Sequence, residues 1–193
     1  ESVGEYYLTG STSKKINTPH TGTGRITEVT MYPMTLFETG ESNGTVSLSR
    51  ILEDADYDID GMISGCDLES LFFAACRGGW PRCMALKKDM AKLEIAKDYY
   101  KQIYRKDISA IDGINRNPEW TRALLWSYAR NMATTAKKKN IFADVKATQN
   151  VTDATLFSYV DALENLFVVR DIDAWTPHLR SKSAIRSAKK HIF

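Results

Sequence analysis

The sequence predicts a mostly α-helical protein with a small β part, and three observations support this fold class. Apolar residues recur at helical spacing over most of the region between residues 45 and 167. Runs of β-prone residues lie before residue 32 and after residue 167. Between them, residues 24–44 read as a strand that gives way to a helical turn. We therefore take this stretch as the junction of a β-rich piece and a helical piece.

Composition excludes several classes of protein. The 193 residues carry 26 Lys and Arg against 24 Asp and Glu, so bulk charge indicates no particular partner. There is no apolar run of transmembrane length and no secretory signal, so we expect no membrane partner. The three cysteines, Cys66, Cys76 and Cys83, predict reduced thiols in a cytoplasmic protein. With only three histidines, we expect no zinc site.

The β-rich piece has two predicted strands, residues 5–8 and 24–32, joined by a polar loop. In the second strand Ile26, Val29 and Met31 are β-prone, and Pro33 stops the run. A short amphipathic helix over residues 34–38 should follow, closed by Gly40.

Three regions follow from these patterns: residues 1–44, a helical region over 45–115, and residues 116–193. The chain enters its first strand without a partner strand, and it stops at the apolar pair Ile192 and Phe193. We expect an internal fragment of a longer protein, truncated at its C-terminus.

An acidic loop follows a predicted pair of helical turns at residues 46–52. Counting from Asp56, the spacing of Asp58, Asp60, Gly61 and Asp67 is that of a calcium-binding EF-hand loop. The twelfth position is Asp rather than the longer Glu, and the segment before the loop makes a poor entering helix. An acidic surface loop is the favoured interpretation, and calcium binding is the alternative.

The next helices have clear start and stop signals. Asp67 is a good N-cap for a helix over residues 68–77, which should end at Gly78 in a left-handed conformation. Pro81 then starts a new helix, and Trp80 should bury its ring between the two helices. A longer helix is expected at residues 90–108.

The last region resembles a helix-turn-helix with strands behind it. We expect helices at residues 117–137, 140–146 and 152–167, the last strongly periodic. A short helix, a tight turn and a longer helix make a helix-turn-helix, and strands after it make a winged helix.

The C-terminal tail is the clearly basic segment of the chain. Its cations face only Asp171 and Asp173, and they predict phosphate contacts with DNA or another nucleic acid. The predicted recognition helix carries no Lys or Arg, so we expect weak, salt-sensitive, nonspecific binding. The candidate nucleic-acid-binding residues are Arg170, Arg180, Lys182, Arg186, Lys189 and Lys190.

No catalytic set is visible, because the histidines have no nucleophile at a recognisable elbow. A different class of function is a protein-interaction role, with a partner protein or a second copy docking on the helical region. Tyr99 and Trp175 would then be exposed anchors, and the alternative is that both belong to the core.

A series of short motifs resembles one protein family over essentially the whole chain. The family is the widespread prokaryotic AAA-type P-loop ATPases whose C-terminal half is a domain of unknown function. The motifs that carry the resemblance are Thr9-Gly10-Ser11, His20 to Ile26, Tyr32 to Glu38, Gly40 to Gly44, Cys76 to Pro81, Tyr128 to Asn131 and Leu163 to Val169.

The resemblance implies that residues 1–44 are the end of a P-loop α/β core and that ATP and magnesium bind mostly outside this chain. The strand end at Thr9 and Ser11 resembles the first sensor of such ATPases. Arg25 matches the family's Gly-Arg pair, with charge stabilisation or loop anchoring as its role. Lys106 stands where members often have Arg, which leaves an arginine-specific role there in doubt. The fragment is expected to be inactive alone, because it lacks the phosphate-binding loop.

Overall fold

The computed structural model describes residues 6–7, 9, 26–27, 29–173 and 189–192. The chain divides into two compact units, and each is described by itself. Unit 1 consists of Glu1–Arg25 and Lys101–Phe193, and unit 2 of Ile26–Tyr100. The expected fold class, mostly helical with a small β part, is confirmed. No helix among the described residues has both the length and the apolar character needed to cross a bilayer.

Unit 2 contains short helices whose ends follow the predicted signals. The Asp67 carboxylate accepts a hydrogen bond of 2.7 Å from the backbone N–H of Ser70, which caps the second helix. Gly78 ends that helix with φ +73° and ψ 173°, a conformation open almost only to glycine. Its helices are α1 (Leu48–Glu53), α2 (Leu68–Arg77), α3 (Pro81–Met84) and most of α4 (Asp89–Gln102).

The strands expected near the N-terminus are not formed by the described residues. Ile26, Val29 and Met31 are 68%, 79% and 85% exposed, and Tyr6 and Tyr7 are also exposed. A strand requires a hydrogen-bonded neighbour, and the described residues supply none for these segments. Residues 29–32, expected in the second strand, are therefore not in a strand, and the remainder of the two predicted strands lies partly outside the described residues.

The helix expected over residues 34–38 is a single turn. The Thr39 amide donates to the Thr35 carbonyl at 3.0 Å. Thr35 and Glu38 exchange side-chain-to-backbone hydrogen bonds of 2.8 and 3.2 Å, as in a capping box. Gly40, at φ +81°, ends the turn as expected.

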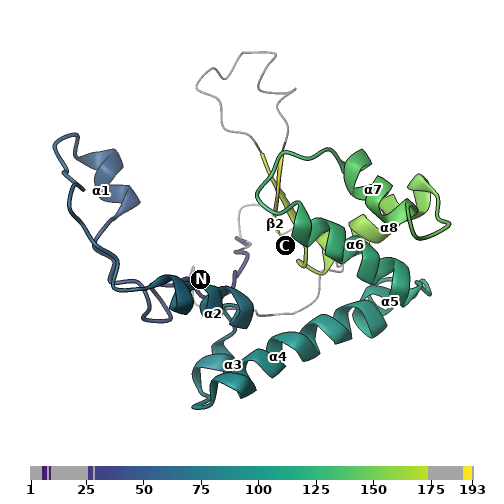
Figure 1. Cartoon of the computed structure of the whole chain (residues 1–193), viewed down its shortest axis with the longest axis horizontal. Coiled ribbons are helices and arrows are strands. Elements are labelled where there is room, and N and C mark those ends of the chain that lie inside the picture. Colours follow the sequence, from purple (N-terminus) through teal and green to yellow (C-terminus); the bar gives the residue numbers. More distant parts are fainter. Residues whose placement is uncertain (1–5, 8, 10–25, 28, 174–188, 193) are drawn as a thin grey trace. The chain divides into compact units, whose positions relative to one another are not determined.

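Unit 1 is built on helices that pack around a common apolar core (Figure 1). The helix expected over residues 90–108 is continuous but changes type, from α4 through the π-helix η1 (Ile103–Asp107) to α5 (Ile108–Ala110). It is followed by α6 (Pro118–Arg130), α7 (Lys138–Lys146) and α8 (Asp153–Asn165). Fully buried side chains at its centre include Ile108, Leu124, Tyr128, Phe142, Leu156, Val160 and Leu163.

A small antiparallel hairpin completes unit 1. It joins β1 (Arg170–Ile172) to β2 (Lys190–Ile192), with Arg170 opposite Ile192 and Asp171 opposite His191. The turn that follows α6 is hydrogen-bonded to the far side of β2. There the Ala133 amide donates to the His191 carbonyl at 2.8 Å, and the His191 amide donates to the Thr134 carbonyl at 3.4 Å.

This turn explains why α6 ends at Arg130 and not near Lys137 as expected. Ala133 has φ +59°, which turns the chain out of the helix and toward β2. The hydrogen bonds to His191 replace those that a longer helix would have made. Tertiary pairing thus overrides the helical periodicity of the sequence at this point.

Candidate functional site

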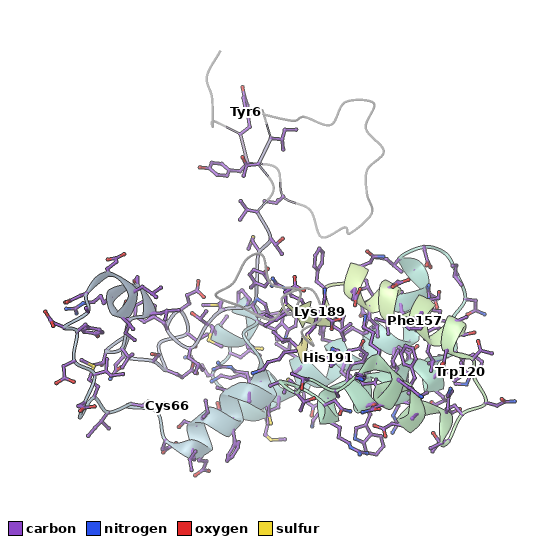
Figure 2. The ribbon with its side chains drawn as sticks, turned by 90° about the horizontal axis from the view of Figure 1, so that it is seen from above. Tyr6, Cys66, Trp120, Phe157, Lys189 and His191 are labelled. Carbon is purple, nitrogen blue, oxygen red and sulfur yellow. The ribbon has the colours of Figure 1, made fainter. Side chains whose placement is uncertain are left out.

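A pocket of about 410 Å³ lies where the start of α7 meets the base of the hairpin. The segment between α6 and α7 supplies its floor, the first residues of α7 supply lysines, and β1 and β2 supply an acid and an imidazole. In Figure 2, Lys189 and His191 lie close together beside the helices of unit 1. The lining residues are Thr135, Ala136, Lys137, Lys138, Asp171, Lys189 and His191.

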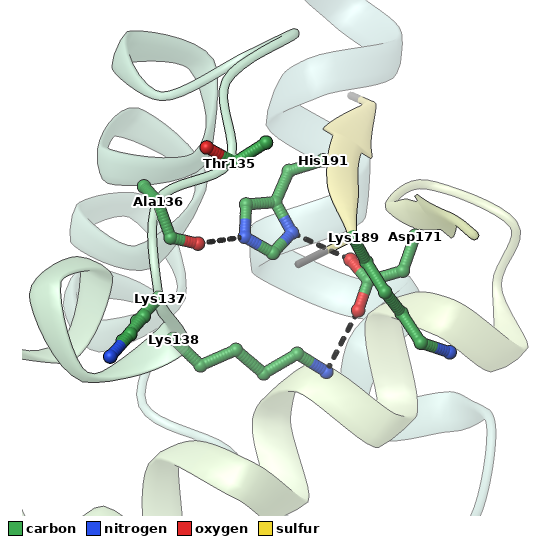
Figure 3. Close-up of a pocket in the computed structure, with 7 residues that line it drawn as sticks. All are labelled: Thr135, Ala136, Lys137, Lys138, Asp171, Lys189 and His191. Atoms are coloured by element: carbon green, nitrogen blue, oxygen red, sulfur yellow. Dashed lines mark hydrogen bonds and ion pairs between the residues drawn. The ribbon is translucent and has the colours of Figure 1, made fainter. Parts of the chain in front are cut away.

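The centre of the site is the buried imidazole of His191, whose side chain is 4% exposed (Figure 3). Its Nδ1 lies 2.6 Å from Oδ1 of Asp171, the residue directly opposite on β1. Its Nε2 lies 2.5 Å from the backbone carbonyl oxygen of Ala136. The ring therefore links the hairpin to the segment that precedes α7.

Lys138 extends this network to a third helix. Its Nζ lies 3.4 Å from Oδ2 of Asp171 and 3.1 Å from Oε1 of Glu164 on α8. Burial raises the pKa of Asp171, but the hydrogen bond with His191 and the charge of Lys138 outweigh it, so the pKa lies below its ordinary value. Burial lowers the pKa of Lys138, and Glu164 and Asp171 more than compensate and raise it.

Tyr128 of α6 packs its ring edge-on against the His191 ring, with centroids 5.6 Å apart. Its hydroxyl is buried and has no hydrogen-bond partner among the described residues. Burial, and then the negative charge of Asp171, raise the pKa of Tyr128 well above its ordinary value. Tyr128 is therefore neutral and adds no charge to the site.

A histidine–aspartate pair is also part of many hydrolase sites, but this one is not arranged for proton transfer to a substrate. A general base needs an imidazole nitrogen with a free lone pair within reach of the reacting group. Both ring nitrogens of His191 are already bonded within the protein, and the side chain is buried. The geometry supports a structural role for the pair.

Three of the predicted nucleic-acid-binding residues, Arg170, Lys189 and Lys190, lie in or directly beside the two strands of the hairpin. Lys189 contacts Asp173 at 2.8 Å, on the same side of the hairpin as the Asp171–His191 pair. The strand register places Arg170 and Lys190 on the opposite face, and both side chains are exposed. Arg180, Lys182 and Arg186 lie outside the described residues.

Sequence reasoning missed the cations at the start of α7. Lys137 is the N-cap of α7, and Lys139 lies in its first turn. Both side chains are exposed, and neither makes an ion pair with any described residue. The signal was the run of three lysines at 137–139, which was overlooked because α6 was expected to extend through Lys137.

Most of the residues that the resemblance assigns to nucleotide binding lie outside the described residues. Thr9 is exposed, and Ser11 and Arg25 lie outside the described residues. Other motif residues meet each other within unit 2. The Met34 amide donates to the Gly79 carbonyl at 2.8 Å, and Glu41 pairs with Arg77.

The acidic loop does not form a metal cage. The Asp54 and Asp58 carboxylates accept hydrogen bonds from backbone amides two residues ahead, at 3.0 and 2.8 Å. Within the described part of the chain, no group of three or more His, Cys, Asp or Glu side chains could hold a metal ion. The two carboxylates are thus engaged in local backbone turns of an exposed loop.

Of the two proposed protein-interaction anchors, Tyr99 and Trp175, the structure describes only Tyr99. Tyr99 is 38% exposed, and its ring lies 4.4 Å from the ring of Trp80. It is therefore part of an intramolecular aromatic contact with one face still accessible. Trp175 lies outside the described residues.

Comparison with known proteins gives one match. Residues 68–193, more than half of the chain, match the family described as Domain of unknown function (DUF8612). No curated protein and no solved structure shows significant similarity to the chain. The match includes all of α6, α7, α8 and the hairpin, so the pocket lies within the matched residues. The chain belongs to this family of proteins with a domain of unknown function.

Proposed function

We propose that residues 116–193 form a winged-helix module that binds nucleic acid, DNA in particular, through its phosphate backbone. The observation that carries the proposal is that Lys137, at the start of α7, and Lys189, directly before β2, line the same pocket. Lys139, in the first turn of α7, is also exposed, and Lys190 is exposed on the other face of the hairpin. Phosphate contacts by lysines supply most of the affinity in nonspecific nucleic-acid binding.

The order of the elements supports the winged-helix assignment. A helix-turn-helix followed by strands makes a winged helix. Here α7, α8, β1 and β2 follow in that order after α6. β2 is hydrogen-bonded to residues 133–134 on one side and to β1 on the other.

The surface of α8 argues for binding without sequence readout. Its exposed side chains include Asp153 and Asp161, and the helix has no Lys or Arg. Readout of base edges in the major groove depends on Arg, Lys, Asn or Gln side chains. We therefore expect a dissociation constant in the range of about 10⁻⁴ to 10⁻⁶ M at physiological salt, typical of nonspecific binding.

Fluorescence anisotropy with a labelled DNA duplex over a salt series tests this function. The double variant Lys137→Glu/Lys139→Glu should weaken binding at least about tenfold at low salt and flatten the salt dependence. The matched control is Lys87→Glu/Lys88→Glu in unit 2, which makes the same change in net charge at two exposed lysines. Equal effects of the two variants, or nanomolar sequence-selective binding by the wild type, would contradict the proposal.

The second candidate is that the chain is part of a cytoplasmic AAA-type ATPase, in which ATP and magnesium bind mostly outside these residues. The favouring observation is that separate motifs of the resemblance contact each other, through the Met34–Gly79 hydrogen bond and the Glu41–Arg77 ion pair. The three cysteines are unpaired, which fits the reducing cytoplasm. In this proposal residues 1–44 are the end of the P-loop core, and nucleotide binding repositions the parts that follow.

Isothermal titration calorimetry with magnesium-ATP tests this second candidate in two proteins. The present chain should show no heat of binding, because the phosphate-binding loop is not among its residues. A longer natural protein that contains this chain should carry a Gly-Lys-Ser/Thr loop and bind magnesium-ATP. Micromolar binding by the present chain, or a longer protein without that loop, would contradict the assignment.

A further inference from the structure

The two hydrogen bonds of the His191 ring indicate which protonation state the ring has. Both partners, the Asp171 carboxylate and the Ala136 carbonyl, are acceptors, at 2.6 and 2.5 Å. A neutral imidazole has one N–H and one lone pair, so it can donate to only one of them. The imidazolium has two N–H groups and satisfies both.

The alternative, a neutral histidine beside a protonated aspartic acid, conflicts with the surroundings of Asp171. Its second oxygen faces the Lys138 ammonium at 3.4 Å, which stabilises the carboxylate. Asp171 is thus an anion at neutral pH, and the proton belongs to the ring.

We propose that His191 is an imidazolium that acts as a pH-dependent latch, holding the β1–β2 hairpin against the segment before α7. Loss of its proton leaves a lone pair facing either the Ala136 carbonyl or the Asp171 carboxylate. One buried acceptor then loses its donor, which is costly in a site with little access to water. The hairpin relieves this by moving away from the segment at residues 133–136.

The latch regulates the nucleic-acid-binding surface, and this step rests on the proposed function. Lys189 lies two residues before His191 and lines the same pocket as Lys137, so loosening of β2 separates these two cations. Binding through phosphates needs these cations together. Affinity for nucleic acid should therefore fall as pH rises through the transition of the latch.

Charged groups on each element packed against His191 set the position of this transition. On β1, Asp171 favours the imidazolium, and on α8, Glu164 and Asp161 add negative charge nearby. Lys138 on α7 disfavours the imidazolium by its positive charge. Lys189, directly before β2 and paired with Asp173, also disfavours it. Tyr128 of α6 is neutral and contributes contact only.

Nuclear magnetic resonance of the ring nitrogens tests the protonation state directly, with His191→Gln identifying the signal. We expect the His191 ring of the folded protein to carry protons on both nitrogens, because both nitrogens face acceptors. A ring in a single neutral tautomer at pH 7.5 would overturn the proposal.

Two variants separate a latch from a merely structural histidine. Asp171→Asn keeps an acceptor for Nδ1–H but removes the negative charge, so the midpoint of the transition should move to lower pH. Lys138→Gln removes the opposing cation, so the midpoint should move to higher pH. Shifts in opposite directions support the latch, and an unchanged midpoint in both variants would overturn it.

Hydrogen exchange and binding give the two functional readouts. Protection of the Ala133 amide, which donates to the His191 carbonyl, should fall at least tenfold across the transition, after correction for the intrinsic rate. Unchanged protection would overturn the latch itself. DNA binding by anisotropy should weaken across the same pH range in the wild type but not in His191→Gln. A wild type that loses protection yet never binds DNA would leave the latch intact and refute the proposed function instead.

Discussion

Glu41 and Arg77 form a two-point ion pair within unit 2. Nη1 of Arg77 lies 2.5 Å from Oε1 of Glu41, and Nη2 lies 3.3 Å from Oε2. The Arg77 side chain is 4% exposed, although it belongs to the last turn of α2. The Thr39 hydroxyl also donates to Glu41. The pair therefore fixes the turn at residues 36–40 to the end of α2.

Replacing Glu41 by alanine should strongly destabilise unit 2. The substitution leaves the buried Arg77 guanidinium without a counter-charge, which costs about 3–5 kcal/mol in comparable buried pairs. Trp80 is the tryptophan of unit 2 among the four in the chain, so ¹⁹F spectra of 5-fluorotryptophan protein report its unfolding separately. The matched control is Glu53→Ala, because Glu53 is exposed and makes no ion pair with a described residue. If Glu41→Ala and Glu53→Ala unfold at the same midpoint of the Trp80 signal, the Glu41–Arg77 pair contributes nothing to the stability of unit 2.

The same pair predicts loss of stability in acid. The hydrogen bond from Arg77 lowers the pKa of Glu41, and burial only partly offsets it. A carboxyl with a depressed folded pKa stabilises the fold above its unfolded pKa of about 4.3, and this contribution disappears as pH falls through the folded pKa. Urea midpoints of the Trp80 signal should therefore drop below about pH 4.3 in the wild type. In Glu41→Gln the fall of the urea midpoint in acid should be smaller. If the fall is unchanged, other carboxyl groups cause it.

Gly79 should not tolerate a side chain, even though its backbone conformation is ordinary. A Cβ there would lie 2.2 Å from the Met34 carbonyl oxygen and 2.7 Å from the Met34 nitrogen. These are backbone atoms, so no rotamer change relieves the clash, and the 2.8 Å hydrogen bond between the two residues would be lost. We expect Gly79→Ala to cost about 2 kcal/mol or more in unfolding free energy. Gly65→Ala, where a Cβ meets nothing within 4 Å, is the control, and equal effects on the Trp80 signal would refute the close contact.

Local signals predicted much of the helical part, because caps and breakers act within a few residues. The limits of α2 followed from Asp67 and Gly78, and the start of α6 from Asn117 and Pro118. The buried periodic positions of α8, such as Leu163, were also predicted correctly.

The remainder depends on contacts between distant residues. Met132 lies within the helix expected over residues 117–137 but is 49% exposed, because the chain leaves the helix to pair with His191. Phe167 ends the helix expected over residues 152–167 but is 68% exposed, at φ +57°, in the turn that leads to β1. The candidate site was not predicted for the same reason, because it depends on contacts between distant residues. Nothing near His191 in the sequence indicates that Ala136 and Asp171 accept its hydrogen bonds.

Trp80 was expected to be buried between two helices, and it is instead half-buried against Tyr99 and Gly78. Its ring is tilted by 58° to that of Tyr99 at 4.4 Å, a favourable aromatic geometry. Trp80→Ala should still lower the unfolding free energy of unit 2 by about 3 kcal/mol, the low end for large aromatic truncations. Hydrogen exchange of the α2 amides measures this change without a tryptophan probe. The control, Trp126→Ala, removes a ring that is 71% exposed, and should change stability by less than about 0.5 kcal/mol.

Arg116 holds the loop before α6 to two other elements of unit 1. Its side chain is 2% exposed and donates to both Asp112 oxygens at 2.7 Å. It also donates to the Ile108 carbonyl at 2.7 Å and reaches Ser158 of α8 at 3.3 Å. Arg116→Met leaves these acceptors without their donor and should cost about 3 kcal/mol in the unfolding of unit 1. Arg122→Met, at an exposed pair of 3.6 Å with Glu119, should cost under about 1 kcal/mol.

The pH dependence of unit 1 supplies an independent check on the same contact. The hydrogen bonds from Arg116 lower the pKa of Asp112 to about 2, against the partial opposition of burial. Asp112 therefore stabilises the fold above its unfolded pKa of about 3.9, and this stability is lost as pH falls through about 2. Chemical unfolding followed at Trp120 should show this loss of stability in the wild type. The loss should be smaller in Asp112→Asn. In Arg116→Met, the protonation of Asp112 should no longer affect stability. If Arg116→Met and the wild type lose stability in parallel between pH 4 and about 2, the acid sensitivity of unit 1 arises elsewhere, and the Asp112–Arg116 contact does not stabilise the loop.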